Sequence, residues 1–64
     1  MAVLLTYNNK TNETRIRCAK KLLPRYESMI LSYIAIYGGR KEKESSRYVY
    51  FTVKENLLFK KWTA

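Results

Sequence analysis

Apolar and polar positions divide the chain into four extended segments and one helix. Residues 2–7 (Ala-Val-Leu-Leu-Thr-Tyr) are apolar on both faces of an extended chain, which is typical of a strand inside a sheet. Residues 14–19 alternate polar and apolar side chains after an asparagine-rich turn, and a period of two indicates a half-buried strand. We therefore predict two strands, joined by a turn in which asparagine suits the left-handed backbone.

A helix is predicted from Leu23 or Pro24 to Tyr37. Proline fits the first turn of a helix and disrupts its interior, so Pro24 marks the start. Gly38-Gly39 marks the end, because glycine readily adopts the conformation that closes a helix. Between them, apolar and tyrosine side chains recur at spacings of three and four: Tyr26, Met29, Ile30, Tyr33, Ile34 and Tyr37.

The last third of the chain combines charge with strong strand character. Residues 40–46 (Arg-Lys-Glu-Lys-Glu-Ser-Ser) have no apolar anchor, and we predict a mobile, charged linker there. Residues 47–53 are β-branched and aromatic, which favours a strand. Residues 57–62 are predicted as a closing strand that pairs with it across a short turn.

The predicted class is α+β: a four-stranded sheet and one helix, in the order ββαββ, forming one domain over residues 1–64. This layout resembles the β-grasp arrangement, with a spacing similar to the small immunoglobulin-binding domains of bacterial surface proteins. The resemblance implies that the first and last strands are central and parallel, with residues 14–19 and 47–53 at the edges. It implies no function. The alternative is β-α-α-β-β, with two helices within residues 12–37, broadly like small phage repressors.

Charge is the main compositional feature. Thirteen Lys and Arg side chains face five Glu, which gives a net charge of +8 on 64 residues. Such a field attracts polyanions, of which nucleic acid is the commonest. With 47% hydrophobic residues, the composition supports a folded core rather than a disordered chain. Cys18 is the single cysteine, so we expect a buried, inert thiol and a reducing, intracellular (cytoplasmic) location.

The chain offers little catalytic chemistry. It has no histidine and no aspartate, so the side chain that titrates nearest neutrality and most metal ligands are missing. We therefore expect no catalysis, no metal and no cofactor. Small toxin ribonucleases are the one enzyme class compatible with this composition, since they can act through arginine, lysine, tyrosine and glutamate.

Strand alternation separates an inward from an outward set of side chains. The inward set is Val3, Leu5, Ile16, Cys18, Val49, Phe51, Val53, Leu57 and Phe59. The outward set is Leu4, Thr6, Arg15, Arg17, Tyr48, Tyr50, Thr52, Leu58, Lys60 and Trp62. A second basic group, Lys20, Lys21 and Arg25, lies near the start of the helix.

Two functions fit the outward set. Cations that track phosphates and aromatic rings that stack on bases favour a nucleic-acid-binding protein, with Arg15, Arg17, Tyr48, Tyr50, Lys60, Trp62, Lys20 and Lys21 as contact residues. The alternative is a phage- or mobile-element-type inhibitor or adaptor that binds an acidic surface of a host protein, with tyrosine and tryptophan as anchors. An apolar patch of Leu4, Leu58 and Trp62 leaves a homodimer open. The longest apolar stretch, Met29–Tyr37, is too short for membrane insertion.

Overall fold

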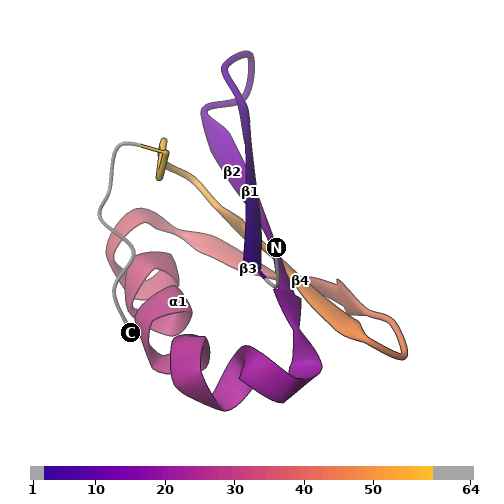
Figure 1. Ribbon diagram of the computed structural model, residues 1–64. Coiled ribbons are helices and arrows are strands. Elements are labelled where there is room, and N and C mark those ends of the chain that lie inside the picture. The colour runs from indigo at the N-terminus through magenta and orange to yellow at the C-terminus, as the bar shows by residue number, and fades with distance from the viewer. Residues whose placement is uncertain (1–2, 59–64) are drawn as a thin grey trace.

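The computed structural model describes residues 3–58, which form one antiparallel sheet with a helix on one face (Figure 1). The elements in chain order are β1 (Val3–Asn8), β2 (Glu13–Ala19), the short 3-10 helix η1 (Lys20–Leu22), α1 (Leu23–Tyr37), β3 (Gly39–Glu44) and β4 (Tyr48–Val53). The strand order across the sheet is β1-β2-β4-β3. The predicted α+β class and the ββαββ order are confirmed.

The pairing inside the sheet differs from the one that the β-grasp resemblance implied. The strands at its centre are β2 and β4, which run antiparallel, and the strands at its edges are β1 and β3. Each central strand buries one full set of apolar side chains, whereas Leu4 on β1 keeps 42% of its surface exposed. Among the described strands β1 pairs with β2 alone, so apolar residues on both of its faces did not make it a central strand.

The linker predicted over residues 40–46 is wrong: most of it is the edge strand β3. Its pairing with β4 places Arg40 opposite Thr52 and Lys41 opposite Phe51, and a bulge follows between Lys41 and Lys43. Backbone hydrogen bonds hold such a strand without an apolar anchor, and charged side chains are the usual protection of an exposed edge. The strand predicted over 57–62 does not begin at Leu57 or Leu58, and residues 59–62 lie outside the described part of the chain.

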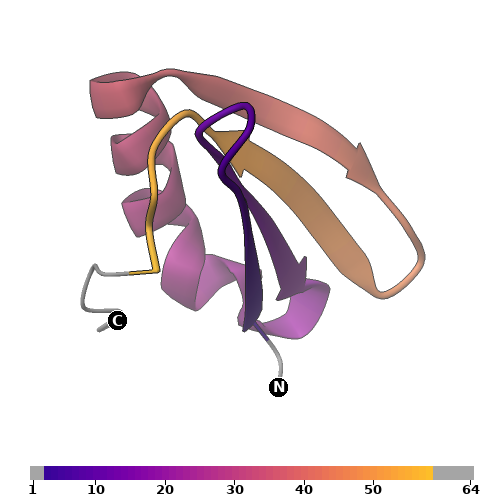
Figure 2. The same ribbon diagram turned by 90° about the horizontal axis from the view of Figure 1, so that it is seen from above.

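The core lies between the sheet and α1, which stands to one side of the strands when the molecule is seen from above (Figure 2). Its buried members are Ile16, Cys18, Ile30, Val49, Phe51, Val53 and Leu57. Val3, Leu5 and the helix side chains Leu23, Tyr26, Tyr33, Ile34 and Tyr37 pack against this cluster. The inward set is thus confirmed, except for Phe59, which is not among the described residues.

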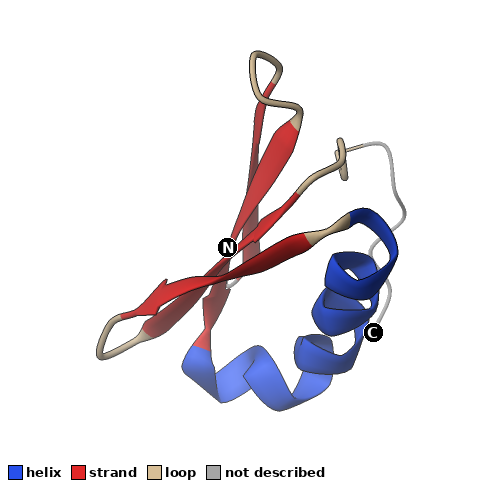
Figure 3. Ribbon diagram, turned by 180° about the vertical axis from the view of Figure 1, so that it is seen from behind, coloured by secondary structure: helices blue, strands red, loops and turns tan. Residues whose placement is uncertain are grey.

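The helix begins and ends as predicted. Pro24 occupies its first turn, and Gly38 follows its last residue with φ of 90° and donates its N–H to the Ile34 carbonyl at 2.9 Å. The two-helix alternative is wrong because Glu13–Ala19 is a strand. The hairpins β1–β2 and β3–β4 project from the centre of the sheet in different directions (Figure 3).

A buried threonine fastens the segment after β4 to β2. The Thr14 hydroxyl donates to the Glu55 carbonyl at 2.6 Å and accepts from the Leu57 N–H at 3.0 Å. These two bonds hold Leu57 in the core, across more than forty residues of sequence. A single hydroxyl therefore positions the end of the described chain.

We expect Thr14→Val to lower the free energy of unfolding by about 1–3 kcal/mol, because valine keeps the volume but removes both hydrogen bonds from a buried site. Urea denaturation followed by circular dichroism measures this change. Thr11→Val is the matched control in an exposed turn, where a change within about 0.5 kcal/mol is expected. Equal effects of the two variants would contradict the role given to Thr14.

Candidate nucleic-acid interface

Four of the predicted contact residues lie together on the face of the sheet that α1 does not cover. Arg17 on β2 stands opposite Tyr50 on β4, and Ala19 stands opposite Tyr48. Arg15, on the same strand as Arg17, stands opposite Thr52. These positions alternate with the buried core residues of both strands, so their side chains point to the other side of the sheet. We call this side of the sheet the outer face.

Two cations lie against two tyrosine rings on the outer face. The Arg17 guanidinium carbon is 4.6 Å from the centre of the Tyr48 ring, and the Lys43 Nζ is 5.0 Å from the centre of the Tyr50 ring. Both distances are within the range of a cation–π interaction. The four side chains come from three adjacent strands, and we call them the cation–tyrosine cluster. Arg17 and both tyrosines are half-buried, so the cluster is held by its surroundings.

The environment of Arg17 is unusually constrained. Its Nε atom is buried and has no hydrogen-bond partner within the described residues. The guanidinium group lies over the Tyr48 ring. Arginine used in this way offers a flat, charged surface rather than a mobile point charge.

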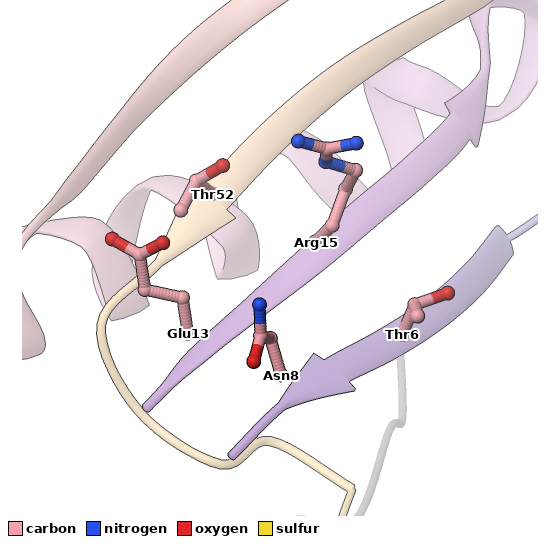
Figure 4. A pocket seen from close by; sticks show the side chains of 5 residues that line it. All are labelled: Thr6, Asn8, Glu13, Arg15 and Thr52. Carbon is pink, nitrogen blue, oxygen red and sulfur yellow. The ribbon is translucent and has the colours of Figure 1, made fainter. Parts of the chain in front are cut away.

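The other end of the outer face is of mixed charge. Arg15 lies there with Thr6, Asn8, Glu13 and Thr52, around a shallow pocket of about 210 Å³ (Figure 4). In the figure Arg15 and Glu13 both rise from β2, between the side chains of β1 and β4. The lining residues are all polar, and the carboxylate of Glu13 belongs to the same pocket as Arg15. The net positive charge at this end of the outer face is therefore smaller than Arg15 alone would give.

Glu42 adds a second carboxylate near this end. Glu42 accepts a hydrogen bond from the Thr52 hydroxyl at 2.6 Å and forms an ion pair with Arg40 at 2.9 Å. The hydrogen bond from Thr52, with smaller help from the charges of Arg40 and Arg15, lowers the pKa of Glu42 from its ordinary value. Its negative charge is thus fixed at neutral pH, and it offsets part of the local positive charge.

A second pocket, of about 440 Å³, opens where β2 ends and β4 begins. Its lining residues are Ala19, Lys20, Lys21, Ser46, Arg47 and Tyr48. The Lys20 N–H donates to the Arg47 carbonyl at 2.8 Å, which ties the two walls together. Because Tyr48 belongs both to this basic pocket and to the cation–tyrosine cluster, the two regions are continuous.

One carboxylate stands beside the basic pocket. Glu44 pairs with Lys20 at 2.9 Å and with Lys41 at 2.7 Å. Hydrogen bonds from Lys41 and then Lys20, with the charges of both, lower the pKa of Glu44 to about 2. Glu44 is therefore ionised at neutral pH, and it shares its single charge between two lysines.

The structure thus brings together Arg15, Arg17, Tyr48 and Tyr50 on one face and places Lys20 and Lys21 beside it. Lys60 and Trp62, the other two predicted contact residues, lie outside the described residues. Sequence reasoning did not place Lys43 or Arg47 beside these residues, whereas the structure does. The run Lys-Glu-Lys-Glu at 41–44 alternates only in the sign of its charge, which is not the apolar and polar alternation that predicts a strand, so no local signal placed Lys43 beside the tyrosines.

Cys18 is fully buried, as predicted, and burial raises the pKa of its thiol. Within residues 3–58, no helix is long and apolar enough to cross a membrane. In the same part of the chain, no three side chains of the histidine, cysteine, aspartate or glutamate type gather as a metal site would require.

Comparisons of the chain with protein-family models, with curated proteins and with solved structures find no significant match. The site must therefore be interpreted from its own geometry and charge.

Proposed function

We propose that this protein binds single-stranded nucleic acid, with little sequence preference, on the outer face of its sheet. The observation that carries the proposal is the cation–tyrosine cluster: Arg17, Lys43, Tyr48 and Tyr50 gathered on the uncovered face of a chain with a net charge of +8. Proteins that hold single strands without sequence preference combine these two residue types.

Each part of the cluster has a distinct role in this proposal. The cations contact phosphates and release counterions when they do. The rings and the arginine plane supply surfaces on which bases stack, since guanidinium groups stack on bases as aromatic rings do. Because Arg17 already covers one face of Tyr48, a base reaches the guanidinium plane before it reaches that face of the ring.

The proposed role is one of binding without catalysis. The cluster offers positive charge and flat surfaces. Glu42 and Glu44, the neighbours of Lys43 in sequence, are engaged by Arg40, Lys20 and Lys41. In this proposal the protein acts inside a cell, because a reducing compartment suits the free thiol of Cys18.

The proposal predicts strong salt dependence for binding to a fluorescein-labelled oligothymidylate, measured by fluorescence anisotropy. If Arg17, Lys43 and one further cation each neutralise a phosphate, log K should fall against log[salt] with a slope of about −2. Affinity for the single strand should exceed affinity for a duplex of the same length, because paired bases cannot stack on the cluster.

Absence of binding at low salt would refute the proposal. A salt-independent affinity, or an equal affinity for duplex and single strand, would also count against it, since neither follows from phosphate contacts combined with base stacking. Stoichiometric, salt-resistant binding to an acidic protein would support the inhibitor or adaptor alternative instead.

A further inference from the structure

The basic pocket at the end of the sheet has the features of a phosphate-binding site. Three of its six lining residues are cations, Lys20, Lys21 and Arg47, and none is acidic. Lys21 and Arg47 are exposed and form no ion pair with another described residue. Their donors are therefore available to a ligand.

The local charge balance favours an anion. Three cations line the pocket, and among the described residues Glu44, which pairs with Lys20, is the one carboxylate that forms an ion pair with any of them. Glu44 is engaged by two lysines and cannot neutralise the remaining charge. Lysine contributes a compact ammonium group and arginine a fork of N–H donors, and phosphate accepts hydrogen bonds from both.

The walls of the pocket are fixed before any ligand arrives. Ser45 donates its N–H to the Tyr48 carbonyl at 2.8 Å and accepts the Tyr48 N–H on its hydroxyl at 3.1 Å, which shapes the turn that carries Ser46 and Arg47. The opposite wall is tied to this turn by the bond from Lys20 to Arg47. Fixed walls reduce the ordering that binding requires.

We propose that the pocket formed by Lys20, Lys21, Ser46 and Arg47 binds a phosphate group of the nucleic acid strand that lies on the outer face. This inference rests on the proposed function for the identity of its ligand and adds a defined phosphate site to it. Tyr48 lines the pocket and belongs to the cation–tyrosine cluster, so a strand that stacks at Arg17 has a phosphate within reach of the pocket. The phosphate is either a monoester at a strand end or a diester within the strand.

The test compares three oligothymidylates, with a 5′-phosphate, with a 3′-phosphate and with neither, for binding to two doubly substituted proteins. Lys21→Ala with Arg47→Ala removes two cations of the pocket. Arg25→Ala with Lys54→Ala removes the same charge from α1 and from the residue beside its C-terminal end. Because Lys21 and Arg47 are exposed to solvent, loss of these two charged contacts should weaken binding about tenfold in the pocket variant, with a much smaller change in the control.

The pattern across the oligonucleotides identifies the source of the phosphate. A gain from a terminal phosphate that disappears in the pocket variant indicates a monoester, and an equal loss for all three indicates a diester. Equal losses in the pocket variant and the control would overturn the inference while leaving the proposed function intact.

A measurement without nucleic acid separates the two proposals fully. Inorganic phosphate, titrated against a chloride control, should shift the backbone amide NMR signals of Lys21, Ser46 and Arg47 in the unsubstituted protein. If no oligonucleotide binds but these signals shift, the proposed function fails and the pocket remains a phosphate site. If oligonucleotides bind, but phosphate shifts none of these signals and the pocket variant binds as tightly as the unsubstituted protein, the pocket is not a phosphate site.

Discussion

Gly39→Ala is expected to destabilise the fold more than any other single glycine substitution. Gly39 has φ of 148°, and a Cβ placed on it would collide with the backbone carbonyl of Thr52 on β4. Backbone strain of about 1–3 kcal/mol then adds to an overpacking cost of about 1–3 kcal/mol. A 64-residue domain has a total stability of about 3–10 kcal/mol, so the variant should lose most of it.

Gly38→Ala is the matched control for this effect. Gly38 also has a positive φ, 90°, but a Cβ there would meet only the Lys54 side chain, at 3.8 Å. The free energy of unfolding of Gly38→Ala should fall by the backbone strain alone, about 1–3 kcal/mol. Urea unfolding monitored by circular dichroism gives both values, and equal midpoints for the two variants would show that β3 does not approach β4 so closely at Gly39.

Arg17→Ala with Lys43→Ala is expected to cause the largest loss of nucleic-acid affinity. Each substitution removes a charge-assisted contact of about 1.5–3 kcal/mol, so the pair should weaken binding by about a hundredfold or more. The slope of log K against log[salt] should become shallower by about 1.4, since two phosphate contacts are lost. Anisotropy titrations at several salt concentrations measure both quantities.

The Arg25→Ala, Lys54→Ala protein again serves as the control, because both double variants keep a net charge of +6, the +8 of the chain minus two. A loss confined to the first variant locates the interface at the cation–tyrosine cluster. Equal losses of affinity in the two variants would mean that the overall charge attracts the ligand and that the outer face is not its binding site. Arg15→Ala should have a smaller effect than either member of the cluster, since Glu13 and Glu42 lie near Arg15.

The inward and outward sets of β2 and β4 could be predicted because their alternation is unambiguous. A period of two places Ile16, Val49 and Phe51 on one side and Arg17 and Tyr50 on the other, whatever the partner strand is. The helix could be predicted in a similar way, because its apolar residues recur at spacings of three and four between Pro24 and Gly38, which mark its ends. Local pattern therefore predicted which residues share a face.

Strand pairing and the identity of the last strand could not be predicted in this way. β3 has no buried side chain, so no hydrophobic signal marks it, and only its pairing with β4 makes it a strand. The segment after β4 has strand-like composition, yet Leu57 is held in the core by the Thr14 hydroxyl rather than by a ladder. Both outcomes depend on tertiary contacts that a single segment does not encode.

The position of the basic pocket also depends on tertiary structure. Lys20 and Arg47 are far apart in sequence and meet because β2 and β4 are neighbours in the sheet. The sequence placed Lys20 and Lys21 in a basic group near the start of the helix, whereas the structure supplies the second wall of the pocket from the β3–β4 turn. Lys20 and Lys21 were therefore predicted as contact residues, but their neighbours Ser46 and Arg47 in the pocket were not.

The cluster on the outer face is divided between the two hairpins, with Arg17 on the first and Lys43, Tyr48 and Tyr50 on the second. Neither hairpin carries a complete binding surface, so recognition requires the docked, native arrangement of both. A nucleic acid strand that contacts both hairpins would bind only the native state, and it would therefore shift the folding equilibrium in favour of that state. A domain this small would then gain from its ligand some of the cohesion that its limited interior does not provide.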